Sequence, residues 1–245
     1  MNSGYYAACA GLRAQTEALE LVANNLANLS TTGFRGQLPT FRSLLAGAPA
    51  VGLSPLNYAI NNFNVLGETR IDQSAGNLEQ TGNALDVAIE GGGFLVVATP
   101  AGTRYTRNGS LKLSAKGLLT TQTDDSVLGD QGPITVPSGI PAIGADGTLS
   151  VNGAVVDKLR VVEFAPASPP ISEGNSYYSA PVGASHPATG SNLRQAMLET
   201  ANVNSVTAAV TMIAVQRHFE MLQGALSAFY TTFNRIAADE LPRLS

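Results

Sequence analysis

The amino-acid sequence predicts an α+β fold, in which long N- and C-terminal helices form a coiled-coil-like helical domain and a mostly antiparallel β-domain lies between them. Three observations predict it: apolar residues at helical spacing near both ends, short apolar runs separated by turn residues in the middle, and a Pro- and Gly-containing stretch between. The predicted domains are an N-terminal helix within residues 1–35, an extended connector at 36–75, the β-domain at 76–195 and a C-terminal helix within 196–245.

The first helix is predicted from Tyr5 to Leu29, a stretch that contains no proline. Its apolar side chains recur at intervals built from three, four and seven residues, which is the spacing of a helix that packs on other helices. These apolar positions are Ala8, Leu12, Leu19, Val22, Leu26 and Leu29. Hydroxyl residues then lead to Gly33, and a glycine at positive φ commonly ends a helix.

The middle of the chain has the pattern of a β-domain. Short apolar runs lie between residues 78 and 178, and the segment before them, the connector, carries Pro39, Pro49 and Pro55. Three dipeptides, Asn108-Gly109, Asp146-Gly147 and Asn152-Gly153, are able to take the left-handed conformations that hairpin turns require. A small, mostly antiparallel sandwich or barrel is therefore expected.

The C-terminal helix is predicted from an apolar stripe that alternates strictly between spacings of three and four. The stripe consists of Met212, Val215, Phe219, Leu222, Leu226, Phe229, Phe233 and Ile236. Upstream, Val203, Val206, Val210 and Ile213 keep a similar spacing in another frame, and we expect them to widen the same apolar face. A helix of roughly 38 residues would span about 57 Å, which is longer than the β-domain could cover.

Two such helices indicate assembly with other molecules. If they pair with each other, a two-helix hairpin still leaves part of each stripe uncovered, and exposed apolar area of that size usually marks an interface. The alternative is an ordinary α+β protein in which both helices fold onto the β-domain. Helical periodicity reports a buried face and not what covers it, so the pattern leaves both interpretations open.

Composition and motifs argue against several other functions. The net charge of −4 and the scattered 14 basic residues provide no basic face for nucleic acid. No apolar run reaches the roughly 20 residues that cross a bilayer, so no membrane insertion is expected, and the N-terminus does not resemble a cleavable signal peptide. The histidines His186 and His218 lie far apart, and hydrolase, metal and phosphate-binding motifs are missing. We therefore expect no enzyme activity, no cofactor and no metal. The alternative of a small β-domain hydrolase or ligand-binding protein lacks a catalytic set.

Three stretches of the chain resemble a known family. They are Ala23–Arg35 (ANNLANLSTTGFR), Gly76–Phe94 with Tyr105–Ser110, and Leu198–Val206 with Met212–Glu220. In this order they resemble the signatures of the flagellar basal-body rod proteins, a family of rod and hook axial proteins, over essentially the whole chain. Two departures are Ala201, where family members usually have serine, and Arg35, where lysine is frequent.

The resemblance implies a structural, self-assembling subunit of the rod, the periplasmic drive shaft of the bacterial flagellum. Its implied partners are copies of itself, other rod subunits and the flagellar type III export apparatus, which fits the missing cleavable signal peptide. Within the family, Tyr5-Tyr6 and the sequence of residues 216–220 are most similar to the proximal rod; a distal rod or hook-type subunit is the alternative.

The asparagines of the first signature have a physical interpretation as well. Their side-chain amides both donate and accept hydrogen bonds, which suits a crowded polar junction. Helix termination explains Asn28, whereas Asn24 and Asn25 are only moderate helix formers inside the helix, and we favour contacts between subunits for these two. The residues expected to form the assembly interface are Leu12, Leu19, Val22, Asn24, Asn25, Leu26, Asn28, Val203, Val206, Val210, Ile213, Val215, Phe219, Leu222, Leu226, Phe229, Phe233 and Ile236.

Overall fold

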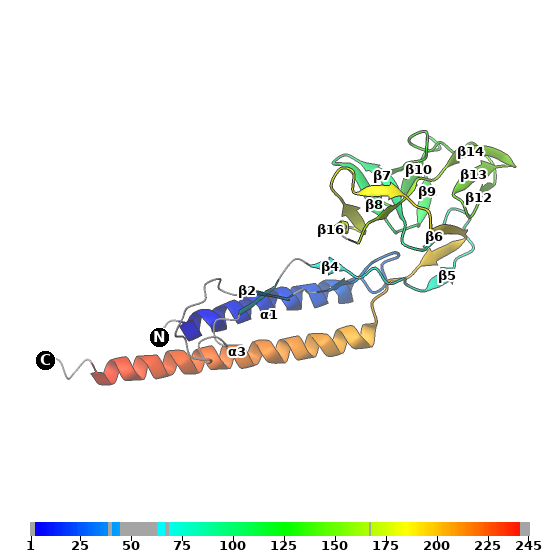
Figure 1. Ribbon diagram of the computed structural model, residues 1–245. Coiled ribbons are helices and arrows are strands. Elements are labelled where there is room, and N and C mark those ends of the chain that lie inside the picture. Colours follow the sequence, from blue (N-terminus) through cyan, green and yellow to red (C-terminus); the bar gives the residue numbers. More distant parts are fainter. Residues whose placement is uncertain (1–2, 39–40, 45–62, 67–68, 167, 241–245) are drawn as a thin grey trace. The chain divides into compact units, whose positions relative to one another are not determined.

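The computed structural model of the protein describes residues 3–38, 41–44, 63–66, 69–166 and 168–240. The chain divides into two compact units, each described here by itself (Figure 1). The first unit comprises Met1–Leu26, Gln37–Thr69 and Ser205–Ser245, and the second comprises Ala27–Gly36 and Arg70–Asn204. Much of the predicted connector, namely residues 39–40, 45–62 and 67–68, lies outside the described residues.

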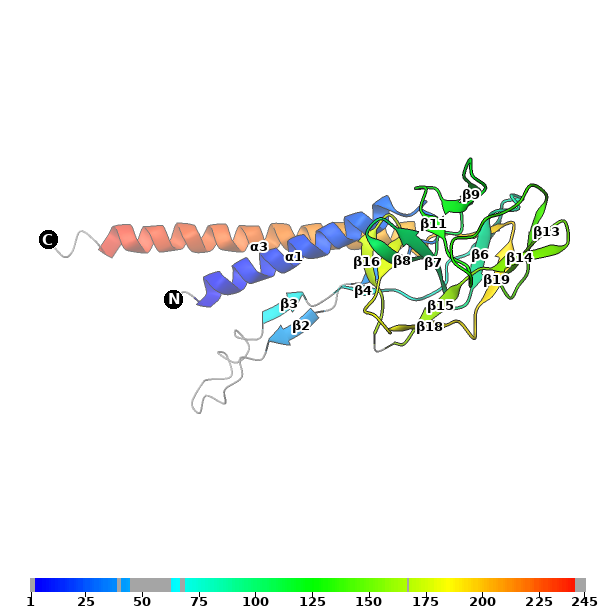
Figure 2. The same ribbon diagram turned by 90° about the horizontal axis from the view of Figure 1, so that it is seen from above.

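The first unit contains the two long helices. Helix α1 spans Ser3–Ala27 and helix α3 spans Ser205–Glu240, and a short hairpin of β2 (Phe41–Leu44) and β3 (Phe63–Leu66) belongs to the same unit, as does β1 (Gln37–Leu38) (Figure 2). Helix α1 ends two residues before the predicted Leu29. Neither helix in the described part of the chain is long and apolar enough to span a membrane.

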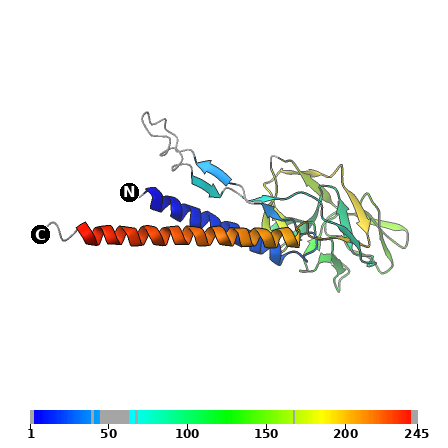
Figure 3. The same ribbon diagram turned by 90° about the horizontal axis from the view of Figure 1, so that it is seen from below.

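The two helices lie side by side but touch at few described points (Figure 3). The side-chain amide of Gln15 donates a 2.9 Å hydrogen bond to the backbone carbonyl of Val215. A Cβ atom added at Gly11 would lie 3.5 Å from the side chain of Leu222, so the backbone of α1 comes close to α3 at this point.

The prediction of a coiled-coil-like helical domain is wrong. The structure has one N-terminal and one C-terminal helix beside a mostly β-sheet central domain, and it shows no coiled-coil pairing of the two helices. The buried positions of α1 are Ala14, Ala18, Leu21 and Val22, whereas Leu12 and Leu19 of the predicted seam are half-buried. Small side chains such as Ala14 and Ala18 make poor knobs for knobs-into-holes packing. The periodicity located helices correctly but did not identify their partners.

The two apolar sets of α3 lie on different faces of the helix. Val206, Val210 and Ile213 are exposed, while Ala208 is buried and Met212 and Val215 are half-buried. The two sets are offset by two residues, which turns one set about 200° from the other at 3.6 residues per turn. The expectation that the upstream valines widen one apolar face is therefore wrong, because they form a second face on the opposite side.

The second unit is built of short strands. Its strands are β4 (Arg70–Ile71), β5 (Leu78–Gln80), β6 (Val87–Glu90), β7 (Phe94–Thr99), β8 (Gly102–Thr106), β9 (Leu111–Leu113), β10 (Leu119–Thr121), β11 (Ser126–Val127), β12 (Pro141–Ile143), β13 (Thr148–Val151), β14 (Ala154–Lys158), β15 (Val161–Phe164), β16 (Ile171–Gly174), β17 (Tyr177–Ser179), β18 (Ser185–Pro187), β19 (Asn192–Gln195) and β20 (Met197–Glu199). Residues 192–199 are thus strands, and the C-terminal helix begins only at Ser205.

These strands pair antiparallel around one main sheet. A 9-stranded sheet has the order β16-β17-β8-β7-β11-β10-β9, with β15 pairing both β7 and β18. Strands β12, β13 and β14 form a 3-stranded sheet, and β19 and β20 return from late in the sequence to pair with β6 and β5. Strands from the end of the domain therefore pair with strands from its beginning.

Strand β7 is the centre of the domain. Its alternate side chains point to opposite faces, as the twofold period of a strand requires. Leu95 and Val97 belong to the larger apolar core, and Phe94 and Val96 belong to a smaller, aromatic core with Tyr178. The ring of Phe94 packs edge-on against that of Tyr178, with 5.3 Å between the ring centroids. The continuous apolar run of this strand reflects burial on both faces.

The predicted turn dipeptides serve different purposes. Asn152 and Gly153 have φ values of 50° and 86° and join β13 to β14, with Val151 opposite Ala154, so this dipeptide is the expected hairpin turn. Gly147 also has a positive φ. Gly109 does not have a positive φ. A Cβ at this position would overlap the backbone carbonyl of Val87, so the glycine permits close approach of two chain segments.

We expect Gly153→Ala to lower stability by about 1 kcal/mol, because an L-residue is strained in the left-handed region. No atom lies within 4 Å of a Cβ built at Gly153, so the effect isolates backbone strain. Gly92→Ala is the matched control, since that site is equally open and has no positive φ. Thermal unfolding of both variants measures the difference, and equal melting temperatures would contradict the assignment.

Tyr177 forms a polar cluster at one side of the main sheet. Its hydroxyl donates a 2.7 Å hydrogen bond to Oδ2 of Asp125 and lies 2.8 and 2.7 Å from the hydroxyls of Thr121 and Thr123. Burial, above all, raises the pKa of this phenol, and the neighbouring Asp125 raises it as well, whereas the two threonines act in the opposite direction. The neutral phenol is therefore favoured in the folded protein.

A raised phenol pKa has a defined effect on stability at alkaline pH. The stabilisation is fully present below the ordinary tyrosine pKa of about 10 and is lost above it, because only the unfolded chain then releases the proton readily. We expect Tyr177→Phe to show a shallower fall in melting temperature than the unaltered protein between about pH 9 and 11. Parallel curves for the two proteins would show that Tyr177 does not contribute.

Candidate functional site

The segments that follow α1 and precede α3 meet in the second unit. We call residues 28–36 and 200–204 the helix roots. The amide of Gly33 donates to the backbone carbonyl of Glu199 at 2.7 Å, and the amide of Asn202 donates to that of Phe34 at 3.3 Å. The amide of Gly36 donates to Oδ1 of Asn202 at 2.7 Å. The two ends of the chain are therefore joined to each other where they enter the β-domain.

A buried ion cluster lies beneath this contact. Nη2 of Arg35 is 2.8 Å from Oε1 of Glu199, and Nη1 of Arg107 is 2.8 Å from Oε2 of the same carboxylate. All three side chains are at most 2% exposed. Buried charges of this kind are tolerated only when they are paired and hydrogen-bonded.

The cluster also holds backbone groups from several segments. Arg107 donates to the carbonyls of Ile89 and Gly91, and its guanidinium carbon lies 5.3 Å from the centroid of the Phe94 ring. The amide of Gly76 donates to Oε1 of Glu199 at 2.8 Å. One carboxylate thus connects the first helix root, the segment before β5, and the segment after β8.

The cluster contains two guanidinium groups and one carboxylate. Burial, most of all, lowers the pKa of Arg35, the nearby Arg107 lowers it further, and Glu199 acts in the opposite direction. The carboxylate of Glu199 therefore offsets repulsion between two cations as well as their loss of hydration. Loss of this one carboxylate would leave two like charges buried together.

Asn202 completes the junction with its side-chain amide. Its Nδ2 donates to the carbonyls of Asp72 and Ser74 at 3.0 and 2.9 Å, while its Oδ1 accepts from the amide of Gly36. One side chain thereby satisfies the backbone of two separate segments, which an apolar residue could not do.

Gly33 is required by the geometry of the first helix root. Its φ is 65°, and a Cβ there would overlap the backbone of Arg107. Both the backbone conformation and the close approach exclude a side chain. The glycine expected to end the first helix therefore also brings the root against the ion cluster.

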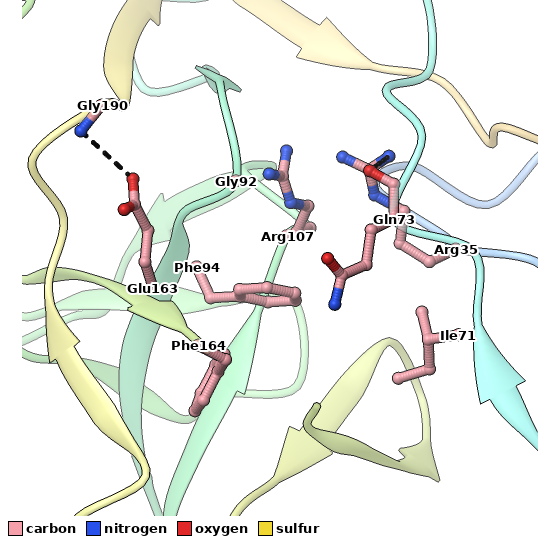
Figure 4. A pocket seen from close by; sticks show the side chains of 9 residues that line it. All are labelled: Arg35, Ile71, Gln73, Gly92, Phe94, Arg107, Glu163, Phe164 and Gly190. Carbon is pink, nitrogen blue, oxygen red and sulfur yellow. Dashed lines mark hydrogen bonds between the residues drawn. The ribbon is translucent and has the colours of Figure 1, made fainter. Parts of the chain in front are cut away.

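A pocket of about 240 Å³ adjoins the cluster (Figure 4). Phe94 and Phe164 lie on one side of it and Ile71, Gln73 and Arg35 on the other, with Arg107 between them. Glu163 is the third charged residue that lines the pocket, and its carboxylate accepts hydrogen bonds from the hydroxyl of Ser191 and the amide of Gly190. Arg35 and Arg107 are almost completely covered, so the pocket presents little of their charge to a ligand.

The described residues contain no group of three or more His, Cys, Asp or Glu that could hold a metal ion. In the junction, one carboxylate pairs with both guanidinium groups, and several of their hydrogen-bonding atoms hold backbone segments. The arrangement fixes the chain in place, and this is a structural task.

The structure places the predicted interface residues in three groups. Half-buried are Leu12, Leu19, Asn25, Leu26, Asn28, Val203, Val215, Phe219, Leu222 and Leu226, and Val22 is buried. Exposed are Asn24, Val206, Val210 and Ile213. The side chains of Phe229, Phe233 and Ile236 lie outside the described residues.

The asparagine signature is used partly within the subunit. Asn25 exchanges two hydrogen bonds with the backbone of Gln37, donating at 2.8 Å and accepting at 2.9 Å. The backbone carbonyl of Asn28 accepts from the amide of Thr31 at 3.0 Å, and its side-chain oxygen accepts from the Thr31 hydroxyl at 3.1 Å, where the helix ends. These contacts account for two of the three asparagines without a neighbouring subunit.

Sequence reasoning missed the residues that organise the junction, namely Arg107, Glu199 and Asn202. All three lie within the stretches that carried the family resemblance. Only 13% of the residues are charged, so Arg107 and Glu199, each the single charged residue of its segment (105–110 and 198–206), were a usable signal. Their mutual partnership was not visible, because 92 residues separate Arg107 from Glu199.

Comparisons with known proteins agree with this organisation. The model described as the flagellar hook protein FlgE/F/G D1 domain matches residues 88–151, and that of the flagellar basal body rod FlgEFG protein C-terminal matches residues 194–235. The model of the flagella basal body rod protein matches residues 6–35. The matched segments contain α1, much of the β-domain and most of α3, which defines the class of flagellar rod and hook proteins.

Individual relatives match over nearly the whole chain. The flagellar basal-body rod protein FlgF of Escherichia coli K12 is 33% identical over 247 residues, covering 93% of this chain and 94% of the relative. FlgF of Mesorhizobium japonicum is 32% identical over 226 residues, covering 90% of each chain. The rod protein FlgG of Borreliella burgdorferi is 29% identical over 251 residues, covering 92% and 94%.

The chain belongs to the family of flagellar basal-body rod proteins. The expectation of a structural subunit of the basal-body rod is confirmed by these relatives, as is its location in the flagellar basal body.

We expect Arg107→Met to destabilise the β-domain by about 2–4 kcal/mol, because the backbone carbonyls of Ile89 and Gly91 lose their donor, while Arg35 remains as the counter-ion of Glu199. Arg194→Met is the matched control, since Arg194 pairs with Glu90 at 3.0 Å on the surface and should change stability by less than about 1 kcal/mol. Urea unfolding followed by tyrosine fluorescence compares them. Equal losses would show that burial of the cluster has no special weight.

Proposed function

We propose that this rod subunit assembles with copies of itself and with other rod subunits through its terminal helices, and that it does so in the periplasm. We further propose that it is exported by the flagellar type III apparatus, and that it catalyses no reaction. The observation that carries the proposal of assembly is the second apolar face of α3.

The second apolar face comprises Val206, Val210, Ile213 and Met221. Their exposed fractions are 70%, 61%, 54% and 62%, so these large side chains lie in solvent in the single subunit. Exposed apolar residues gathered on one side of a helix mark an interaction surface more often than scattered ones do. Because α1 contacts the opposite side of α3, it is not available to cover this face within the same subunit.

The chemistry of the remaining surface of α3 supports the same conclusion. Between Ser205 and Asn234, only Arg217 and Glu220 carry a charge, whereas a helix face that stays in water normally carries many. Several exposed positions hold small residues instead, among them Ala209, Ala214 and Gly224. Small side chains let the backbone of a neighbouring helix approach closely.

The interface is of the kind that builds an extended structure. One side of α3 contacts α1 of the same chain and the other side is exposed. We propose that a neighbouring subunit covers the exposed side with a surface other than its own α3 face. Contacts between unlike surfaces produce rings or helical filaments, while like surfaces close into dimers. This geometry suits a subunit of a rod.

The predicted interface residues of α1 and of the later part of α3 complete the proposal. Leu12, Leu19 and Leu26 are half-buried, as are Phe219 and Leu226, so neighbouring subunits would cover what remains of them. Asn24 is exposed, so its side chain is accessible to a neighbouring subunit.

Within the rod we propose a proximal position, on the sequence features at Tyr5-Tyr6 and at residues 216–220. A distal rod or hook-type position is the alternative, since relatives named FlgF and FlgG both match over nearly the full chain. Replacing the corresponding gene in a motile bacterium separates the two positions, because only the correct replacement restores motility.

We expect the double substitution Val210→Asp and Ile213→Asp to abolish self-association and motility while leaving the β-domain folded, because two charges would be buried in the interface. Sedimentation of the purified protein at rising concentration measures self-association. A strain that depends on this chain for its rod reports motility.

Gln223→Asp is the matched control, since it adds a charge at an exposed, polar position of the same helix. It should assemble normally. A doubly substituted protein that still assembles and still restores motility would refute the proposed interface.

A further inference from the structure

Glu199 is the point at which four separate segments of the second unit meet. Its carboxylate pairs with Arg35 and Arg107 and accepts from the amide of Gly76, and its backbone carbonyl accepts from the amide of Gly33. We infer that Glu199 closes a clasp, formed with Arg35, Arg107 and Asn202, which ties both helix roots to the β-domain and opens as one unit while the β-domain stays folded.

The clasp is distinct from the apolar cores. Neither core cluster includes Arg35, Glu199 or Asn202, and the larger core is built from strands such as β6, β7 and β13. Among the described residues of the helix roots, Phe34 is the one buried large apolar side chain. The roots are held chiefly by polar contacts, and releasing them exposes one large buried apolar side chain, that of Phe34. Segments with few buried apolar contacts are the ones that open locally.

The clasp joins residues that are far apart in the sequence. Gly76 lies 123 residues from Glu199, and Gly36 lies 166 residues from Asn202. By contrast, β7 and β8 are adjacent hairpin strands, with Thr99 opposite Gly102. Contacts over long sequence distances carry the larger entropy cost of loop closure. The clasp should therefore close after the β-domain hairpins, when the last fifth of the chain is in place.

The carboxylate is what makes the clasp cooperative. Without its charge, the two guanidinium groups of Arg35 and Arg107 would be buried with no counter-ion, and burial already lowers the pKa of Arg35. The repulsion between the two cations and their loss of hydration are relieved when the first helix root moves into water and takes Arg35 with it. The hydrogen bond from the Gly36 amide to Asn202 would then break as well, although neither residue contacts the Glu199 side chain in the pairs described above. Its loss would therefore show that the contacts open together.

Three backbone amides report directly on the clasp. Those of Gly33, Gly36 and Gly76 donate to Glu199 O, Asn202 Oδ1 and Glu199 Oε1, respectively. In Glu199→Gln we expect hydrogen exchange at all three to accelerate by about a hundredfold, as the loss of a buried charge partner implies. Exchange at the amide of Val97 in β7 should remain much slower than at the three glycines, because it requires the β-domain itself to unfold. Glu90→Gln, which removes an exposed charge from the same domain, is the control and should alter none of the four.

Two outcomes would overturn the inference. If Gly76 alone exchanges faster, the contacts are independent and no clasp exists. If Val97 is no better protected from exchange than the three glycines, the junction is part of the global fold. Should Glu199→Gln not fold, native-state exchange of the unaltered protein in low denaturant decides the question: Gly33, Gly36 and Gly76 must share one opening transition that precedes that of Val97, and separate or simultaneous transitions would refute the clasp.

Discussion

The path of both helix roots in the second unit depends on a single buried carboxylate that is shared by two arginines. Glu199 stabilises Arg35 and Arg107, and through them it holds the first helix root against the segment after β8. Such a cluster contributes less through net attraction than through the cost of any arrangement that leaves a charge unpaired. This cost selects one path for the chain where it leaves α1 and where it approaches α3. The geometry of both helix roots follows from that choice.

The family signatures acquire a common physical role at this junction. Gly33, Arg35, Gly76, Arg107 and Glu199 lie in stretches that appear unrelated along the sequence, and the fold brings them into mutual contact. A glycine is required where Gly33 approaches Arg107, and a side-chain amide is required where Asn202 satisfies separate backbone segments. The signatures therefore describe the inside of the subunit at least as much as its contacts with neighbours.

Local chemistry was predictable from the sequence, whereas partnership was not. The existence of both helices, the central β-domain and the turn at Asn152-Gly153 follow from spacing and residue type, which act over a few residues. The coiled-coil-like pairing failed because a periodic stripe does not reveal its partner, and the offset between Val210 and Met212 turned one expected face into two. The ion cluster could not be foreseen, since no local rule pairs Arg107 with a glutamate 92 residues away.

The uncovered side of α3 also has a consequence for the subunit before it reaches its destination. A helix that exposes Val206, Val210 and Ile213 to water is prone to associate with other apolar surfaces, including those of other copies of the same chain. Association of this sort increases with concentration, so a cell that accumulated the free protein would risk its aggregation away from the basal body. Synthesis at a rate that matches the incorporation of subunits into the rod would keep the concentration of free protein low and limit its aggregation.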